Sequence, residues 1–182
     1  LLGAREGELW RHDVATAVVA EVIPLVSRRR VPPEAFTAAL LHDIGRVIMY
    51  QQVDERSMRL IDAARDAGES SVSAERSILG ADHGEIGALV AQAWNLPDTL
   101  VHAIRLHEEP NEAPDHRARE ICDIVKVADA GARKLGFQCG EPFEQVHDLE
   151  SSLKCLGLEG AKFDEVCDLA LERFEEVLAQ FE

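Results

Sequence analysis

The sequence predicts an all-α protein, a helical bundle of about seven to nine helices. Apolar residues recur at three- and four-residue spacing through almost the whole chain, which is the pattern of helices with a buried face. Alternating runs rich in Val, Ile and Thr, separated by hairpin turns, are missing. With 182 residues and 46% hydrophobic content, the chain can bury one sizeable core, so we expect a single domain.

Caps, prolines and glycines predict where each helix begins and ends. The first helix contains Pro24, where we expect a bend, and Pro33 opens a second helix so apolar that it must lie in the core. Asp82 and Glu85 have the spacing of a capping box, which makes His83 the first residue of its helix. The predicted helices cover residues 6–29, 33–50, 54–67, 73–80, 83–94, 97–107, 116–135, 143–156 and 161–181, with a loop over 110–114.

Residues 1–136 are expected to form the core of the domain, with the helices of residues 137–182 packed on it. Because the chain opens at Leu1 on a half-helix, we expect it to be part of a longer protein. Trp10 and Trp94 are expected to pack in the core or against another domain rather than to stack on a ligand.

Composition limits the partners and the compartment. The formal charge of −15, from 34 acidic and 19 basic residues, predicts against binding to nucleic acid or to an anionic membrane. No apolar run reaches the ~20 residues of a membrane span. The four cysteines form no CxxC pair, which favours reduced thiols in a cytoplasmic protein.

The dipeptide His-Asp occurs three times, and only His42-Asp43 lies in an apolar helix. A buried carboxylate costs several kcal/mol unless it is paired or binds a metal, so both side chains require partners. Gly45 indicates a close approach of backbone or ligand, and Arg46 could hold an anion beside the pair. From this segment alone, a hydrogen-bonded pair that only joins helices is as good an interpretation as a functional site.

Other polar residues favour a metal. His12 and Glu8 stand four apart on one face of the first helix, a spacing at which two side chains can reach one ion. His83 lies at a helix N-terminus, which favours the neutral imidazole that a metal needs. Asp129 interrupts an apolar run, and His107 ends its helix. Several imidazoles and carboxylates on separate helices have the chemistry of a divalent metal site with nitrogen and oxygen ligands.

The order of these residues resembles the HD superfamily of metal-dependent phosphohydrolases, and most of all its HDOD branch, the HD-related output domains of bacterial signalling proteins. The resemblance covers roughly residues 8–136. The stretches that carry it are Leu9 to His12, Ala35 to Arg46, Glu75, Leu79 to Ala88, Trp94 to Pro97 and Ala103 to Pro110.

The resemblance implies an HD-domain-like bundle with one or two divalent ions, Fe, Mn, Zn or Ni. It makes His12, His42, Asp43 and Asp129 ligands of one metal. Asp43 then bridges to a second metal held by His83 and His107, while Glu8 corresponds to an additional carboxylate ligand of some relatives. In catalytic relatives such a centre activates water for attack on a phosphoester, with Asp43 and a basic residue at the position of Arg46 as the catalytic groups.

Two functions stay open at this point. The first is a signal-transduction output domain with a structural or regulatory metal, whose partners are signalling domains, a small phosphorylated ligand or a second copy of the chain. The second is a metal-dependent phosphohydrolase that acts on a phosphomonoester or on a phosphodiester of a nucleotide. The resemblance predicts against hydrolysis of cyclic-di-GMP, because Asn111 to Pro114 occupies the place of the Gly-Tyr-Pro motif.

Overall fold

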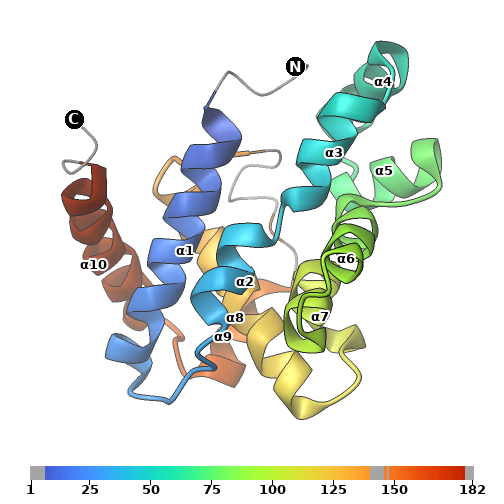
Figure 1. Ribbon diagram of the computed structural model, residues 1–182. Coiled ribbons are helices and arrows are strands. Elements are labelled where there is room, and N and C mark those ends of the chain that lie inside the picture. The colour runs from blue at the N-terminus through green and yellow to red at the C-terminus, as the bar shows by residue number, and fades with distance from the viewer. Residues whose placement is uncertain (1–6, 140–145, 147, 179–182) are drawn as a thin grey trace.

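The protein is an all-α helical bundle, and the computed structural model describes residues 7–139, 146 and 148–178. Figure 1 shows α1, α2 and α8 in the middle of the bundle, with α10 on one flank and α6 and α7 on the other. In chain order the elements are α1 (Glu8–Ser27), α2 (Ala35–Leu41), α3 (Ile44–Gln52), α4 (Glu55–Asp66), α5 (Ser71–Leu79), α6 (His83–Ala93), α7 (Asp98–Leu106), the 3-10 turn η1 (Pro110–Glu112), α8 (His116–Lys134), α9 (Leu149–Leu156) and α10 (Ala161–Leu178).

The main hydrophobic core forms around α1 and α8. A Cβ added to Gly131 of α8 would meet Val19 Cγ1 of α1 at 2.9 Å, so these two helices approach each other closely. The C-terminal helices extend the same core, because α9 packs on α8 while α10 packs on α1 and α8 through Phe163, Val166 and Phe174. The long helices α1 and α8, which carry His12 and Asp129, are therefore packed directly on each other.

The chain leaves its helical course at His42 and Asp43, which separate α2 from α3. The prediction of one continuous helix over residues 33–50 is therefore wrong. Asp43 has φ −97° and ψ 14°, and its carbonyl oxygen accepts a hydrogen bond from the Arg46 N–H as α3 begins. The close approach predicted at Gly45 is confirmed and explains the break. A Cβ on Gly45 would lie 1.9 Å from the His83 carbonyl oxygen, so α3 packs backbone to backbone on α6.

Local capping interactions place several helix starts as predicted. Asp82 and Glu85 form a reciprocal capping box at the start of α6. Asp54 and Asp115 accept hydrogen bonds from backbone N–H groups at the starts of α4 and α8. The helix predicted over residues 143–156 is too long, because α9 begins only at Leu149 and the described residues Val146 and Asp148 are not helical; Asp148 has φ 53°. Residues 143–145 and 147 lie outside the described part of the chain, as do the outer ends of the first and last predicted helices.

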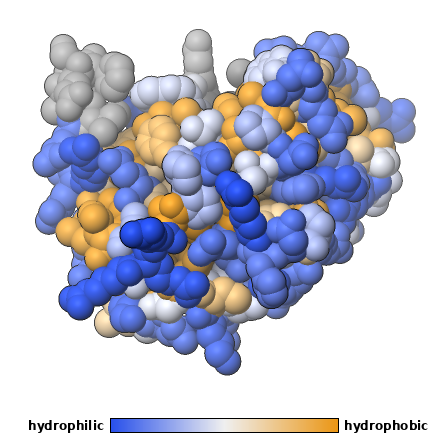
Figure 2. Space-filling model, turned by 60° about the horizontal axis from the view of Figure 1, so that its bottom comes forward, coloured by the Kyte–Doolittle hydropathy of each residue, from blue (hydrophilic) through white to orange (hydrophobic). Residues whose placement is uncertain are grey.

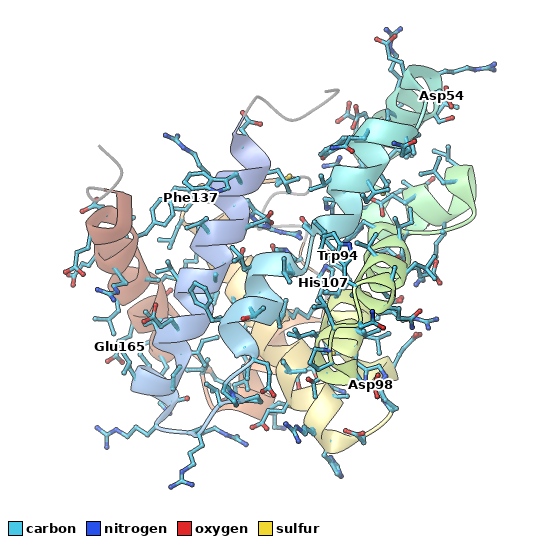
Figure 3. All side chains as sticks on the ribbon, viewed as in Figure 1. Asp54, Trp94, Asp98, His107, Phe137 and Glu165 are labelled. Carbon is cyan, nitrogen blue, oxygen red and sulfur yellow. The ribbon has the colours of Figure 1, made fainter. Side chains whose placement is uncertain are left out.

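Apolar side chains also reach the surface, where Figure 2 shows them scattered among hydrophilic ones on one face. Trp10 is 51% and Trp94 57% exposed, so neither packs in the core of this domain, and packing against another domain stays a prediction. Trp10 lies in the first turn of α1, and Trp94 is the C-cap residue of α6. His107, in contrast, lies inside the bundle, while Asp54 and Glu165 lie at its periphery (Figure 3). Among the described helices, none combines the length and the hydropathy that a membrane crossing requires.

Candidate metal centre

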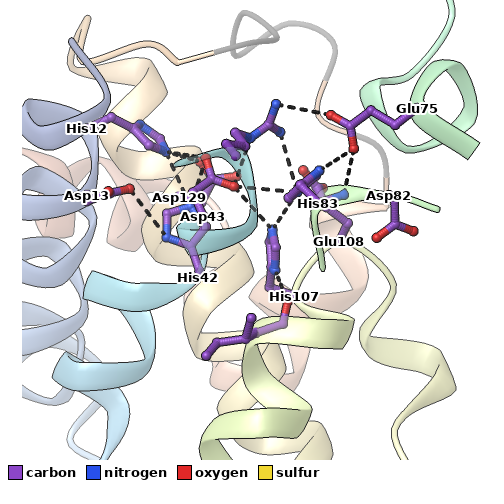
Figure 4. Close-up of polar contacts among 12 residues, drawn as sticks. His12, Asp13, His42, Asp43, Glu75, Asp82, His83, His107, Glu108 and Asp129 are labelled. Carbon is purple, nitrogen blue, oxygen red and sulfur yellow. Dashed lines mark hydrogen bonds and ion pairs between the residues drawn. The ribbon is translucent and has the colours of Figure 1, made fainter. Parts of the chain in front are cut away.

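Six residues singled out in the sequence meet in one buried cluster inside the bundle (Figure 4). Each is at most 1% exposed, although they come from five different segments of the chain. The six are His12 of α1, His42 and Asp43 at the break between α2 and α3, His83 at the start of α6, His107 directly after α7, and Asp129 of α8.

The four histidines of the cluster are oriented in the same way. In each ring Nδ1 lies within hydrogen-bonding distance of an oxygen that can only accept, so Nδ1 is the donor and Nε2 offers a lone pair whenever the ring is in the neutral form that a metal binds. A second hydrogen bond of this kind is the usual arrangement behind metal-binding histidines. The Nδ1–H groups donate from His12 to the Phe137 carbonyl (2.8 Å), from His42 to the Ala39 carbonyl (2.7 Å), from His83 to Glu75 Oε2 (2.6 Å) and from His107 to the Ile104 carbonyl (2.9 Å).

The Nε2 atoms face one another in two pairs. His12 Nε2 lies 3.3 Å from His42 Nε2, and His83 Nε2 lies 3.2 Å from His107 Nε2. Two lone pairs so close in a buried site repel each other unless a proton or a metal ion lies between them. Both pairs therefore have the donor arrangement of a cation site.

Asp43 stands between the two pairs of rings. Its Oδ2 is 3.9 Å from His12 Nε2 and 3.7 Å from His42 Nε2, and we call these three groups the His12 half. Its Oδ1 is 3.5 Å from His83 Nε2 and 4.0 Å from His107 Nε2, and we call these the His83 half. Oδ2 is buried and has no hydrogen-bond partner, which is costly for a carboxylate oxygen. A divalent ion in the His12 half would satisfy that oxygen and both nitrogens.

Arg46 fills the space beside the His83 half. Its Nε donates to Asp43 Oδ1 (2.9 Å), its Nη1 to Glu75 Oε1 (3.4 Å) and its Nη2 faces His83 Nε2 (3.4 Å). Burial opposes ionisation of Asp43, but Arg46 and the neighbouring imidazoles outweigh it and hold the pKa of Asp43 well below its usual range. The cluster thus contains a carboxylate rather than a neutral acid.

Asp129 lies beside the His12 half, and Arg133 binds both of its carboxylate oxygens. Its Oδ1 is 3.1 Å from His12 Nε2, while Arg133 binds it with Nε to Oδ1 at 2.8 Å and Nη2 to Oδ2 at 2.6 Å. Arg133 also contacts Glu108 Oε1 at 3.2 Å. Burial raises the pKa of Asp129, but Arg133 and the imidazole lower it further than burial raises it, so this carboxylate is ionised as well.

The two histidines of the His83 half differ in protonation. Burial lowers the pKa of His107 to about 3, which keeps that ring neutral. Burial and Arg46 also lower the pKa of His83, but Glu75 and Asp43 outweigh them and leave it above its ordinary value. The prediction that the helix N-terminus keeps His83 neutral overlooked the carboxylate of Glu75. In the metal-free protein, a proton would therefore compete with a metal ion for Nε2 of His83.

Two carboxylates of the site were not predicted from the sequence. Asp13 joins His12, His42 and Asp43 in a group with donor atoms within 4.8 Å of one another, and burial raises its pKa to about 8. Glu75 is 1% exposed and orients His83. The signals available in the sequence were an acid next to His12 and an acid in the middle of the short helix α5.

Two predicted ligands, Glu8 and Asp129, lie outside the two groups of converging donors found among the described residues, although Asp129 still contacts His12 Nε2 at 3.1 Å. Glu8 begins α1, one turn before His12, whereas the two groups consist of His12, Asp13, His42 and Asp43 and of Asp43, His83 and His107. The role of Glu8 as a ligand remains a prediction.

Comparison with known proteins agrees with this architecture. Residues 2–110 match the HDOD domain. An uncharacterized protein of Treponema pallidum is 30% identical over 143 residues, which are 76% of this chain and 27% of that protein.

Solved structures share the fold at lower identity. A candidate signal transduction protein from Marinobacter aquaeolei has a TM-score of 0.72 at 21% identity, covering 98% of this chain and 39% of that one. A candidate phosphohydrolase from Shewanella amazonensis has a TM-score of 0.64 at 22% identity, covering 93% and 66%. The chain thus spans about a quarter of the Treponema relative and less than two thirds of either structure.

Proposed function

The chain belongs to the HDOD family, and on that premise we propose that it is a bacterial signal-transduction output domain whose His-Asp centre holds a divalent metal in a structural or regulatory role. The partners that suit this role are signalling domains, a small phosphorylated ligand or a second copy of the chain. The compartment that suits it is the cytoplasm.

One observation supports the proposed metal site most directly. The Nε2 lone pairs of His12 and His42 face each other at 3.3 Å beside Asp43 Oδ2, an ionised buried oxygen without a hydrogen bond. Leaving these groups uncompensated would cost several kcal/mol. A divalent ion with nitrogen and oxygen ligands removes that cost, and Fe, Mn, Zn and Ni all accept such donors.

The same geometry favours a centre without turnover. The imidazoles and Asp43 are at most 1% exposed. Among the described residues, the cavity that reaches Arg46 and Glu75 has a volume of about 20 Å³, which holds roughly one water molecule. That cavity is too small for a phosphoester. The guanidinium of Arg46 is already paired with Asp43 and Glu75.

The alternative is a metal-dependent phosphohydrolase. It is favoured by the two-sided approach to Asp43, in which each carboxylate oxygen faces one pair of imidazoles, as a bridging ligand would. When bound, a divalent metal would lower the pKa of a coordinated water and stabilise charge on a phosphoester. Arg46 would then have to leave Glu75 in order to contact the substrate.

The two functions are separated by measuring metal content and hydrolysis on the same samples. We would purify the chain, quantify Fe, Mn, Zn and Ni, and assay bis-p-nitrophenyl phosphate with the wild type and with Asp43→Asn. The control is Asp123→Asn, since Asp123 is an equally buried carboxylate of α8 that pairs with Arg119 and Ser152, away from the centre.

The proposed function predicts metal in the wild type and in Asp123→Asn, loss of metal in Asp43→Asn, and no hydrolysis by any of the three. Hydrolysis that follows the metal and disappears in Asp43→Asn would establish the phosphohydrolase instead. A wild type that stays metal-free after incubation with each ion would refute the metal centre.

A further inference from the structure

We propose that Arg46 limits the centre to a single metal ion, bound in the His12 half, by holding its guanidinium where a second ion would bind. The inference rests on the proposed metal site and goes beyond it, because it fixes how many ions bind, which half holds them and which residue decides this.

The two oxygens of Asp43 have different surroundings. Oδ1 accepts a hydrogen bond from Arg46 Nε at 2.9 Å, whereas Oδ2 is buried without a hydrogen-bond partner. One carboxylate thus offers a satisfied oxygen to the His83 half and an unsatisfied one to the His12 half.

The imidazoles differ in the same sense. Arg46 Nη2 lies 3.4 Å from His83 Nε2, so that lone pair faces a cationic N–H group. The facing lone pairs of His12 and His42 have no comparable donor from Arg46. Every contact that a second ion would need on the side of Asp43 and His83 is already directed at the arginine.

Charge reinforces this difference. A metal bound to Asp43 Oδ1 and His83 at the usual ligand distances of about 2.0–2.2 Å would lie within a few ångströms of a guanidinium that is always charged. In a buried site, where water does not screen charge, a monovalent and a divalent cation this close repel strongly. Arg46 is 3% exposed, so water screens its charge little.

Glu75 keeps the arginine in place. Its Oε1 accepts from Arg46 Nη1 at 3.4 Å, while its Oε2 accepts from the backbone N–H of His83 at 2.8 Å and from the His83 ring at 2.6 Å. The carboxylate therefore binds both the arginine and the neighbouring ring. Arg46 is in this sense a positioning residue of the centre, whose charge substitutes for the second ion.

The test is the number of ions bound, measured without any substrate. The full chain is stripped of metal with a chelator, equilibrated with MnCl2 by dialysis, and analysed for Mn per chain and by low-temperature EPR, which distinguishes an isolated Mn(II) from a coupled pair. The variants are Arg46→Met, which removes the charge, and Arg46→Lys, which retains it. Arg119→Met is the matched control, because Arg119 forms an i,i+4 pair with the buried Asp123 far from the centre.

We expect one ion with an isolated signal in the wild type, Arg46→Lys and Arg119→Met, and two ions with a coupled signal in Arg46→Met. Two ions in the wild type, or one ion in a folded Arg46→Met, would overturn the inference while leaving the proposed metal site intact. No ion in any variant would refute both.

If circular dichroism shows that Arg46→Met is unfolded, the double variant Arg46→Met/Glu75→Gln removes both charges of the buried pair and leaves all ligands of the His83 half in place. It should also bind two ions, and a folded double variant that binds one ion contradicts the role of Arg46.

Discussion

The substitution Gly45→Ala tests the contact on which the geometry of the centre depends. Gly45 follows Asp43 by two residues and lies directly against α6, where an added Cβ would be 1.9 Å from the His83 carbonyl oxygen and 2.8 Å from the Gly87 nitrogen. Both obstacles are backbone atoms, so no side chain can rotate away. The methyl group therefore forces α3 and α6 apart.

The magnitude follows from the same distances. Restoring an ordinary contact of 3.4 Å at the His83 carbonyl requires a separation of the two helices by about 1.5 Å. Overpacking in well-packed interiors costs about 1–3 kcal/mol, and a backbone obstacle places Gly45→Ala at or above about 3 kcal/mol of unfolding free energy. For a chain of this size, that loss lowers the melting temperature by about 6–12 °C.

Urea denaturation followed by circular dichroism measures the loss. Gly131→Ala is the matched control, because its Cβ would meet only side-chain atoms of Val19, which can adjust, at 2.9 Å. We expect the control to lose less than half as much stability as Gly45→Ala. A loss below about 1 kcal/mol for Gly45→Ala would refute the backbone contact between α3 and α6.

Three further predictions concern charge and metal. In the metal-free protein, burial raises the pKa of Asp13 to about 8, so the folded state retains a proton that the unfolded state releases near pH 4, and stability falls as the pH rises between these values. Asp13→Asn should reduce this fall, and equal losses for both proteins between about pH 5 and pH 8 in urea unfolding would contradict it. Glu75→Gln should cost about 3 kcal/mol in urea unfolding, because it leaves Arg46 with one buried carboxylate and weakens the acceptor of His83; a loss near zero would contradict that pairing. Adding a chelator to the metal-loaded chain should lower its melting temperature by about 5–10 °C, the effect of losing a ligand present at about 100 times its Kd, and an unchanged melting temperature would argue against a metal that supports the fold.

The sequence predicts most of the fold because local chemistry sets most helix boundaries. Asp82 and Glu85 satisfy the first N–H groups of α6 within one turn, and Asp54 and Asp115 do the same for α4 and α8. Each depends on neighbours a few residues away, which a sequence displays directly.

The break between α2 and α3 escaped prediction because its cause is a contact between distant segments. No proline lies between Glu34 and Gln52, and the residues around His42 suit a helix. Gly45 indicated a close approach but did not reveal that the His83 backbone was the neighbour. The exposure of Trp94 was missed for a related reason, since a side chain at a helix end is buried only if another element lies against it.

The candidate site was predicted in outline, because isolated polar residues in apolar segments need partners and the family resemblance grouped them. His12, His42, Asp43 and Asp129 do lie together. Asp13 was missed because its dipeptide with His12 looked like the other His-Asp pairs, and nothing in the chain order shows which side of α1 faces the cluster. The pairing of Arg46 with two carboxylates likewise depends on tertiary geometry alone.

The most direct test of the central claim is anomalous diffraction from crystals of the chain grown with a divalent metal such as Mn²⁺ or Zn²⁺. The structure predicts an anomalous peak about 2.0–2.3 Å from the Nε2 atoms of His12 and His42 and from Oδ2 of Asp43, with the Nδ1 hydrogen bonds of both rings preserved. A map without a peak inside the cluster, in crystals that contain the ion elsewhere or in solution at a saturating concentration, would contradict the metal centre.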